Sequence, residues 1–175
     1  MIPPKIPPQE EINSLIINYQ NGKFKIAMNL ALLMSKKFPD HPLSWKVLGA
    51  LFTHAGQMDK ALVANQNAVR LDPKDINSHF NLGVILKELG KFKEAEPLLR
   101  HALEGSERTL GPDHSLTLLS VGNLGFLLAE QGKLNEAEPL YRRALEGQER
   151  TLGPDHSYTL TSVNNLGSLL QAQGK

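Results

Sequence analysis

Apolar residues recur at spacings of three and four along most of the chain from Gln9 onward. This period places them on one face of an α-helix and therefore predicts amphipathic helices. Glycine-containing turns interrupt the pattern about every 34 or 42 residues, at Gly22, Gly56, Gly90, Gly132 and Gly174. A glycine is favoured where a helix ends in a left-handed conformation. We therefore predict an all-α chain of helix pairs, with each glycine ending the first helix of a pair.

The chain also repeats its own sequence. Residues 94–115 read EAEPLLRHALEGSERTLGPDHS, and residues 136–157 read EAEPLYRRALEGQERTLGPDHS. Self-similarity at a fixed period indicates stacked copies of one unit, because a single helix pair cannot bury its apolar face. We predict a Pro-rich leader over residues 1–8 and an array over residues 9–175. Its repeats are expected at about 8–41, 42–75, 76–117 and 118–159, with a half repeat at 160–175.

One set of residues resembles a known repeat signature: Trp45, Leu48, Gly49, Phe52, Ala61, Ala68 and Pro73. Their types and spacings resemble the tetratricopeptide repeat (TPR). The longer third to fifth repeats, with their EAEPL, LGPDH and NNL elements, are similar to the 42-residue repeats of kinesin light chains. The first two are similar to bacterial 34-residue arrays. The resemblance implies a right-handed superhelical solenoid of antiparallel helix pairs, in which first helices line a concave groove.

The charge and residue composition of the chain argue against some classes of binding partner. A net charge of +1, from 19 basic and 18 acidic residues, provides no field to attract nucleic acid or an anionic membrane. The chain has no cysteine, which excludes disulfides and thiolate metal sites and fits a reducing compartment. With no apolar run long enough for a membrane helix, we expect a cytoplasmic protein. The four prolines of the leader favour an extended conformation, which indicates a stiff disordered leader or a lead-in to the first helix. The alternative is a ligand for a proline-binding module.

Motifs for catalysis or metal binding are not found in the sequence. His114 and His156 each follow an aspartate in equivalent loops, and repetition translates such positions along an array instead of bringing them to one ion. The pairs Glu94/Glu96 and Glu136/Glu138 stand at helix starts, where carboxylates complement the helix dipole. We therefore predict no enzyme activity, no cofactor and no metal site.

The resemblance places the residue before each Leu-Gly pair in the groove, namely Asn81, Asn123 and Asn165. An amide can both donate to and accept from the main chain of an extended peptide. We interpret the three as a ladder that binds a peptide backbone; the alternative is that asparagine is merely tolerated at a solvated position. By helical register the neighbouring groove positions are Lys46, Ala50, Asn77, Phe80, Val84, Lys87, Leu119, Phe126, Glu130, Asn164, Ser168 and Gln171. Their apolar members are either anchor sites for the peptide or partly buried packing.

The predicted function is a non-catalytic protein-interaction scaffold that binds an extended peptide segment in the groove. One alternative is the substrate-presenting part of a larger transferase. Another is an assembly unit that self-associates through its C-terminal helix, where Leu166, Leu169 and Leu170 lack a second helix to cover them. Neither nucleic acid nor a membrane is an expected partner.

Local chemistry predicts several details of the helices. We expect caps at Asp75 for the helix from residue 76, at Asp113 or Ser115 for the next first helix, and at Asp155 or Ser157 for the last. Gly105 and Gly147 stand near the ends of second helices and are expected to let those ends fray. Trp45 is expected to be buried in the core, as the repeat pattern implies.

Overall fold

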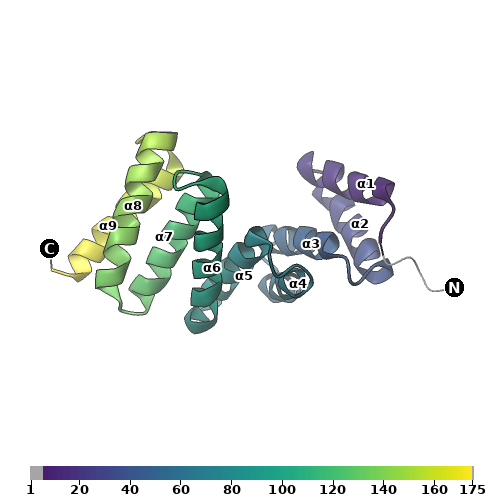
Figure 1. The fold of residues 1–175 in the computed structure, drawn as a ribbon, viewed down its shortest axis with the longest axis horizontal. Helices are drawn as coiled ribbons and strands as arrows, with labels where there is room; N and C mark the ends of the chain where they lie inside the picture. Colours follow the sequence, from purple (N-terminus) through teal and green to yellow (C-terminus); the bar gives the residue numbers. More distant parts are fainter. Residues whose placement is uncertain (1–5, 175) are drawn as a thin grey trace. The chain divides into compact units, whose positions relative to one another are not determined.

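The computed structural model describes residues 6–174, and these residues form nine α-helices and no strand (Figure 1). The prediction of an all-α fold is confirmed. The helices are α1 (Gln9–Gln20), α2 (Phe24–Lys37), α3 (Pro42–His54), α4 (Met58–Leu71), α5 (Ile76–Glu88), α6 (Phe92–Leu110), α7 (Ser115–Glu130), α8 (Leu134–Leu152) and α9 (Ser157–Ala172). None of these helices is long and apolar enough to cross a membrane.

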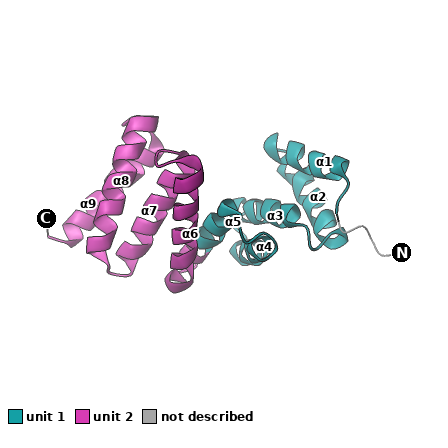
Figure 2. Ribbon diagram, viewed as in Figure 1, with its two compact units in different colours: residues 1–85 teal, residues 86–175 magenta. Residues whose placement is uncertain are grey.

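The chain divides into two compact units, residues 1–85 and residues 86–175 (Figure 2). In the first unit α1 packs on α2, α2 on α3, and α3 on α4. In the second unit α6 packs on α7, α7 on α8, and α8 on α9, while α7 also contacts α9. The turn glycines Gly22, Gly56, Gly90, Gly132 and Gly174 have φ between 68° and 76°. This confirms the prediction that glycine ends each first helix in a left-handed conformation.

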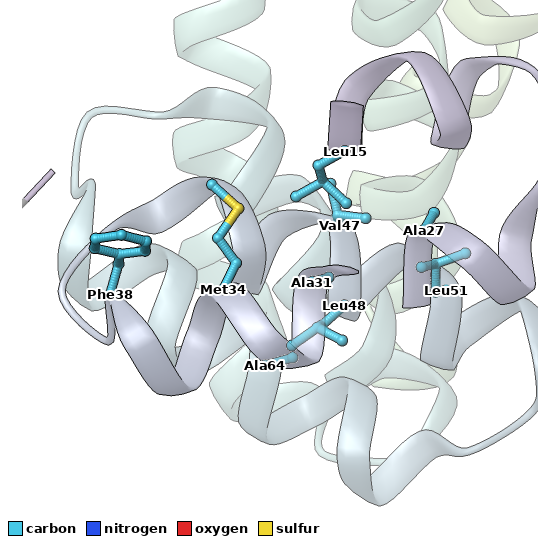
Figure 3. Close-up of a cluster of buried hydrophobic side chains, with 9 residues drawn as sticks. All are labelled: Leu15, Ala27, Ala31, Met34, Phe38, Val47, Leu48, Leu51 and Ala64. Atoms are coloured by element: carbon cyan, nitrogen blue, oxygen red, sulfur yellow. The ribbon is translucent and has the colours of Figure 1, made fainter. Parts of the chain in front are cut away.

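The core of the first unit is built where α1, α2, α3 and α4 meet (Figure 3). Small residues of the second helices let the helices approach closely. The cluster consists of Leu15, Ala27, Ala31, Met34, Phe38, Val47, Leu48, Leu51 and Ala64. Trp45 is only partly buried against this cluster, so the expectation of a buried Trp45 is wrong. Its indole Nε1 donates to the carbonyl oxygen of Pro39 at 2.8 Å, which keeps one ring edge near the surface.

The core of the second unit is centred on α7. Five apolar side chains of this helix are at most 2% exposed: Leu118, Val121, Leu124, Leu127 and Leu128. Helix α8 approaches α7 so closely that a Cβ added at Gly147 would lie 2.4 Å from Leu118 Cδ2. Gly105 and Gly147 are both buried, and their helices continue to Leu110 and Leu152. The expectation of frayed ends at these glycines is therefore wrong, and at Gly147 the missing side chain makes room for Leu118 of α7.

The N-cap residues predicted from the sequence are confirmed for α5 but not for α7 and α9. The Asp75 Oδ2 atom accepts the Ser78 backbone N–H at 2.8 Å, as predicted for a cap. Helices α7 and α9 are capped instead by His114 and His156, each of which accepts a backbone N–H through Nδ1 at 3.2 Å. The caps expected at Asp113 or Ser115, and at Asp155 or Ser157, are wrong because the helices begin directly after the histidines.

The two ends of the chain also differ from expectation. Leu166 and Leu169 are 8% and 3% exposed, since α9 packs on α8 and contacts α7. The expectation that these two leucines lack cover is therefore wrong, and Leu170 is partly buried. Most of the predicted Pro-rich leader, residues 1–5, lies outside the described residues. Within the described part, Pro7 is buried and the Pro8 carbonyl oxygen accepts N–H groups from the first turn of α1.

Candidate functional site

Five of the predicted groove residues line one pocket of about 350 Å³ in the second unit: Lys87, Leu119, Asn123, Phe126 and Asn165. They come from the end of α5, from α7 and from α9, which are all first helices. The remaining lining residues are Glu88, Leu118, Gly122, Gln148, Tyr158, Thr161 and Ser162. The pocket therefore combines apolar walls with a few amide, hydroxyl and charged groups, as ligand sites in proteins usually do.

Lys87 organises one side of this pocket. Its Nζ donates to Asn123 Oδ1 at 2.9 Å, forms an ion pair with Glu88 at 3.0 Å and lies 4.9 Å from the centroid of the Phe126 ring. The Lys87 side chain is only 13% exposed. Asn123 Nδ2 in turn donates to the Leu119 carbonyl oxygen at 2.9 Å. The Asn123 amide thus has a fixed orientation, and one N–H and one lone pair remain for a ligand.

Helix α9 contributes four lining residues to the pocket, Tyr158, Thr161, Ser162 and Asn165. Asn165 is partly exposed, and within residues 6–174 its side chain has no hydrogen-bond partner. Tyr158 also lines the pocket and is half-exposed. Ser162 Oγ donates to Gln148 Oε1 at 2.6 Å, and both residues are buried. A fixed amide and an unengaged amide therefore line the same pocket together with two aromatic rings.

The first unit has a smaller set of the same kind. Phe80, Asn81 and Val84 of α5 line a pocket of about 340 Å³. Helix α3 supplies Ala50, Thr53 and His54, and Ile85 completes the lining. Asn81 is partly exposed in this pocket. Two of the three predicted ladder asparagines, Asn123 and Asn165, therefore share a pocket, and Asn81 lines one in its own unit.

Other predicted groove residues lie elsewhere. Five are exposed and line neither pocket: Asn77, Glu130, Asn164, Ser168 and Gln171. Lys46 forms ion pairs with Asp72 at 2.9 Å and Asp75 at 3.2 Å, so its charge is already neutralised. Helical register did not predict Tyr158, Thr161 and Gln148 as pocket residues. An exposed aromatic residue at the start of a first helix was the signal available for Tyr158.

A separate charged cluster surrounds Glu96 at the turns of the second unit. Glu96 accepts hydrogen bonds from Arg100 at 2.9 Å and Lys133 at 3.0 Å. Desolvation by burial alone would raise the pKa of Glu96, but the hydrogen bonds of Arg100, Lys133 and Gln131 outweigh it and lower the pKa to about 2. These charges satisfy one another. Residues 6–174 contain no group of three histidine, aspartate or glutamate side chains arranged to hold a metal ion.

Comparison with protein families gives matches over most of the chain. A family model described as "Tetratricopeptide repeat" matches residues 75–146 and 116–175. A second, described as "TPR repeat", matches residues 49–90. These ranges include every residue of both pockets.

A curated protein with a similar sequence is a targeting signal receptor. The peroxisomal targeting signal receptor of Kluyveromyces lactis is 25% identical over 104 residues, which are 59% of this chain and 18% of that protein. The chain thus spans less than a fifth of this relative's length.

Two solved structures are similar in fold. The putative kinesin light chain repeats of Podosopora anserina match with a TM-score of 0.70 at 22% identity, over 95% of this chain and 86% of that chain. YrrB, described as a TPR protein with an unusual peptide-binding site, matches with a TM-score of 0.75 at 18% identity, over 94% and 76%. The predicted solenoid of helix pairs is confirmed by these structures.

Proposed function

Because the chain belongs to the tetratricopeptide repeat family, we propose that it is a non-catalytic protein-interaction module that binds an extended peptide segment over its first helices. The observation that carries the proposal is that Lys87, Leu119, Asn123, Phe126 and Asn165, chosen by register, line one pocket. The similarity to YrrB, with its peptide-binding site, and to a targeting signal receptor supports the same class of function.

The pocket of the second unit suits one apolar side chain of such a peptide together with its flanking main chain. Leu119, Phe126 and Tyr158 provide the apolar walls. The Asn165 amide is available to donate to a peptide C=O and to accept from a peptide N–H. Asn123, held by Lys87, offers one further donor. Each such hydrogen bond contributes about 0.5–1.5 kcal/mol. Burial of the apolar side chain therefore has to supply the larger part of the roughly 8 kcal/mol that micromolar binding of a short peptide requires.

The pocket of the first unit offers similar chemistry for a peptide segment. Asn81 is flanked there by the apolar side chains of Phe80 and Val84. Phe80 and Val84 would determine which peptides bind, because a hydrogen bond from an amide to the peptide main chain does not depend on the peptide's side chains.

A selection from a random-peptide display library tests the proposal. The full chain is the bait, and the variant Asn81→Ala, Asn123→Ala, Asn165→Ala is the counter-screen. The matched control is Asn29→Ala, Asn67→Ala, Asn135→Ala, which removes three asparagines of second helices that line neither pocket. We expect enriched peptides to bind the control as tightly as the native chain and the first variant at least tenfold more weakly. Equal binding by both variants would reject the ladder.

A further inference from the structure

The polar groups around Asn123 in the pocket of the second unit are mostly donors. Lys87 Nζ donates one of its three N–H groups to Asn123 Oδ1 at 2.9 Å and forms an ion pair with Glu88 at 3.0 Å. Asn123 Nδ2 donates one of its two N–H groups to the Leu119 carbonyl oxygen at 2.9 Å. The second N–H of Asn123 remains for a ligand, whereas the remaining lone pair of Oδ1 lies beside a positive ammonium group.

This arrangement favours a ligand C=O over a ligand N–H at Asn123. A positive charge attracts the oxygen of a C=O dipole and repels the hydrogen of an N–H dipole, and it does so more strongly where water is partly excluded. The Lys87 side chain is only 13% exposed. A ligand N–H directed at Asn123 would thus lose its water without gaining a good acceptor, which weakens binding. A ligand residue that has a C=O and no N–H avoids this loss.

Lys87 has no equivalent at the other two asparagines of the proposed ladder. The position three residues before the turn glycine is Ala129 in α7 and Thr53 in α3. Ala129 has no polar side-chain atom that could engage Asn165. Thr53 lines the same pocket as Asn81, but its hydroxyl group donates to a carbonyl oxygen of its own helix at 2.8 Å. The excess of donors is therefore a property of Asn123 and its surroundings.

The surroundings of Asn123 favour a neutral, apolar ligand residue. On α7 Asn123 lies between Leu119 and Phe126, which share its helix face and line the same pocket. Tyr158 adds a second aromatic ring to the lining. The Glu88 carboxylate already neutralises the lysine ammonium at 3.0 Å and would repel a carboxylate of the ligand. Proline combines an apolar ring with a backbone C=O and no backbone N–H.

We infer that the ligand carries a proline opposite Asn123, and that Lys87 is the residue that determines this selectivity. The inference rests on the proposed peptide binding and specifies one residue of the peptide. Proline also favours the extended main-chain conformation proposed for the ligand, so less conformational entropy is lost when it binds.

A random-peptide display library is the first probe. The full chain is the bait, and enriched peptides that lose binding to Asn123→Ala are retained. We expect these peptides to share a proline next to an apolar residue. The same selection with Lys87→Met as the bait should lose the preference for proline, because methionine has a similar length and leaves Asn123 Oδ1 free to accept a peptide N–H.

The matched control bait is Lys60→Met. It also removes an ammonium group near a phenylalanine ring, 5.6 Å from the centroid of Phe52, and Lys60 lines neither pocket. This bait should enrich the same proline-containing peptides as the native chain. Circular dichroism of both methionine variants checks that helix content is unchanged.

Synthetic versions of one enriched peptide then separate the missing N–H from the proline ring. The shared proline is replaced by alanine, which restores the N–H, or by N-methylalanine, which does not. Fluorescence anisotropy should show that the native chain binds the alanine version at least about fivefold more weakly than the proline version, because a donor is left unpaired. The N-methylalanine version should bind nearly as tightly as the proline version. Lys87→Met should bind the alanine version at least as tightly as the proline version.

Several outcomes would overturn the inference while keeping the proposed function. One is a set of peptides that depend on Asn81, Asn123 and Asn165 together but share no proline, or that share an aspartate or glutamate in its place. Another is equal weakening of the alanine and N-methylalanine versions, which would assign the preference to the ring alone. An unchanged ranking in Lys87→Met would show that Lys87 does not determine the selectivity. If no peptide is enriched on the native chain, the proposed function fails and this inference fails with it.

Discussion

Two glycines inside helices, Gly147 and Gly167, differ in the packing around them, so that the absence of a side chain affects stability differently at the two positions. Gly147 has Leu118 against it, whereas Gly167 faces open space. Both lie inside helices, where glycine is about 0.5–1 kcal/mol less favourable than alanine. The packing around each glycine therefore decides whether its replacement by alanine raises or lowers the free energy of unfolding.

Gly147→Ala should destabilise the fold and Gly167→Ala should stabilise it. At Gly147 the new Cβ would lie 2.4 Å from Leu118 Cδ2, and overpacking of this kind costs about 1–3 kcal/mol. At Gly167 only the gain in helix propensity remains, about 0.5–1 kcal/mol. The free energy of unfolding, measured by urea denaturation of each variant, checks both signs. A shift in the same direction for the two variants would contradict this account.

Glu96 should make stability depend on pH in the acid range. Its folded-state pKa is lowered from the ordinary value of 4.5 to about 2. A carboxylate with a lowered pKa contributes stability above its unfolded pKa and loses that contribution as the pH falls through the folded one. The stability difference between the native chain and Glu96→Gln should thus be constant above about pH 5 and shrink between pH 4.5 and 2. Urea midpoints measured across this range give the difference.

The control for that experiment is Glu104→Gln on the same helix. Glu104 is exposed and forms no ion pair within residues 6–174. Its replacement should leave the pH profile of the urea midpoint parallel to that of the native chain. Parallel profiles for Glu96→Gln as well would show that the Arg100 and Lys133 contacts do not favour the charged carboxylate.

At the scale of elements, three helices begin at a side-chain acceptor, which is Asp75 for α5, His114 for α7 and His156 for α9. Asp75 has two functions at α5, since its carboxylate accepts the Ser78 N–H at 2.8 Å and pairs with Lys46 at 3.2 Å. Partial burial alone would raise the pKa of Asp75, but hydrogen bonds from Ser78 and the Lys46 ammonium hold it below its ordinary range. The cap and the ion pair can be separated by substitution.

Asp75→Ala should cost about 0.5–2 kcal/mol, the usual effect of losing an N-cap acceptor. Asp75→Asn keeps an oxygen that can accept the Ser78 N–H and loses only the charge, so it should cost less. Thermal unfolding followed by circular dichroism ranks the three proteins. Equal losses for the two variants would assign the whole effect to the Lys46 ion pair.

The elements themselves were predictable because the two signals, apolar period and turn glycine, are local. Local sequence signals do not determine which side of a helix another helix covers. Leu166 and Leu160 are both leucines of α9, yet the first is 8% exposed and the second 49%. The positions of α7 and α8, which both contact α9, decide between the two leucines. Trp45 and Gly147 were misjudged for the same reason, since each depends on a neighbouring segment, Pro39 for one and Leu118 for the other.

The candidate site was predictable to a similar extent. Register predicted that Leu119, Asn123 and Phe126 share a helix face, because residues three and four apart are neighbours on a helix, and all three line one pocket. It could not show that Lys87 reaches across to Asn123, since a lysine side chain has many conformations of similar energy. Nor could it place Gln148, which comes from a second helix.

At the scale of the molecule, the two compact units should respond separately to core damage. Leu48 in the first unit and Leu127 in the second are both at most 1% exposed. Replacing either by alanine should cost about 2–5 kcal/mol. In repeat arrays each repeat contacts mainly its neighbours, so the loss stays near the altered position.

Hydrogen exchange followed by mass spectrometry checks this expectation. Leu48→Ala should speed exchange in α1, α2, α3 and α4, and Leu127→Ala should speed it in α6, α7, α8 and α9. Faster exchange throughout the chain in either variant would indicate a single cooperative unit.

The ion pairs of the second unit also give the array a direction. Of the four pairs that join α6 and its loop to Lys133 and α8, three place the acid on the earlier repeat and the base on the later one. A repeat therefore presents mainly basic residues to the repeat before it in the chain and mainly acidic residues to the repeat after it. Duplication of a whole repeat in the gene would create two new junctions that are already matched in shape and charge. Such arrays can lengthen by recombination between their own copies without any compensating substitution.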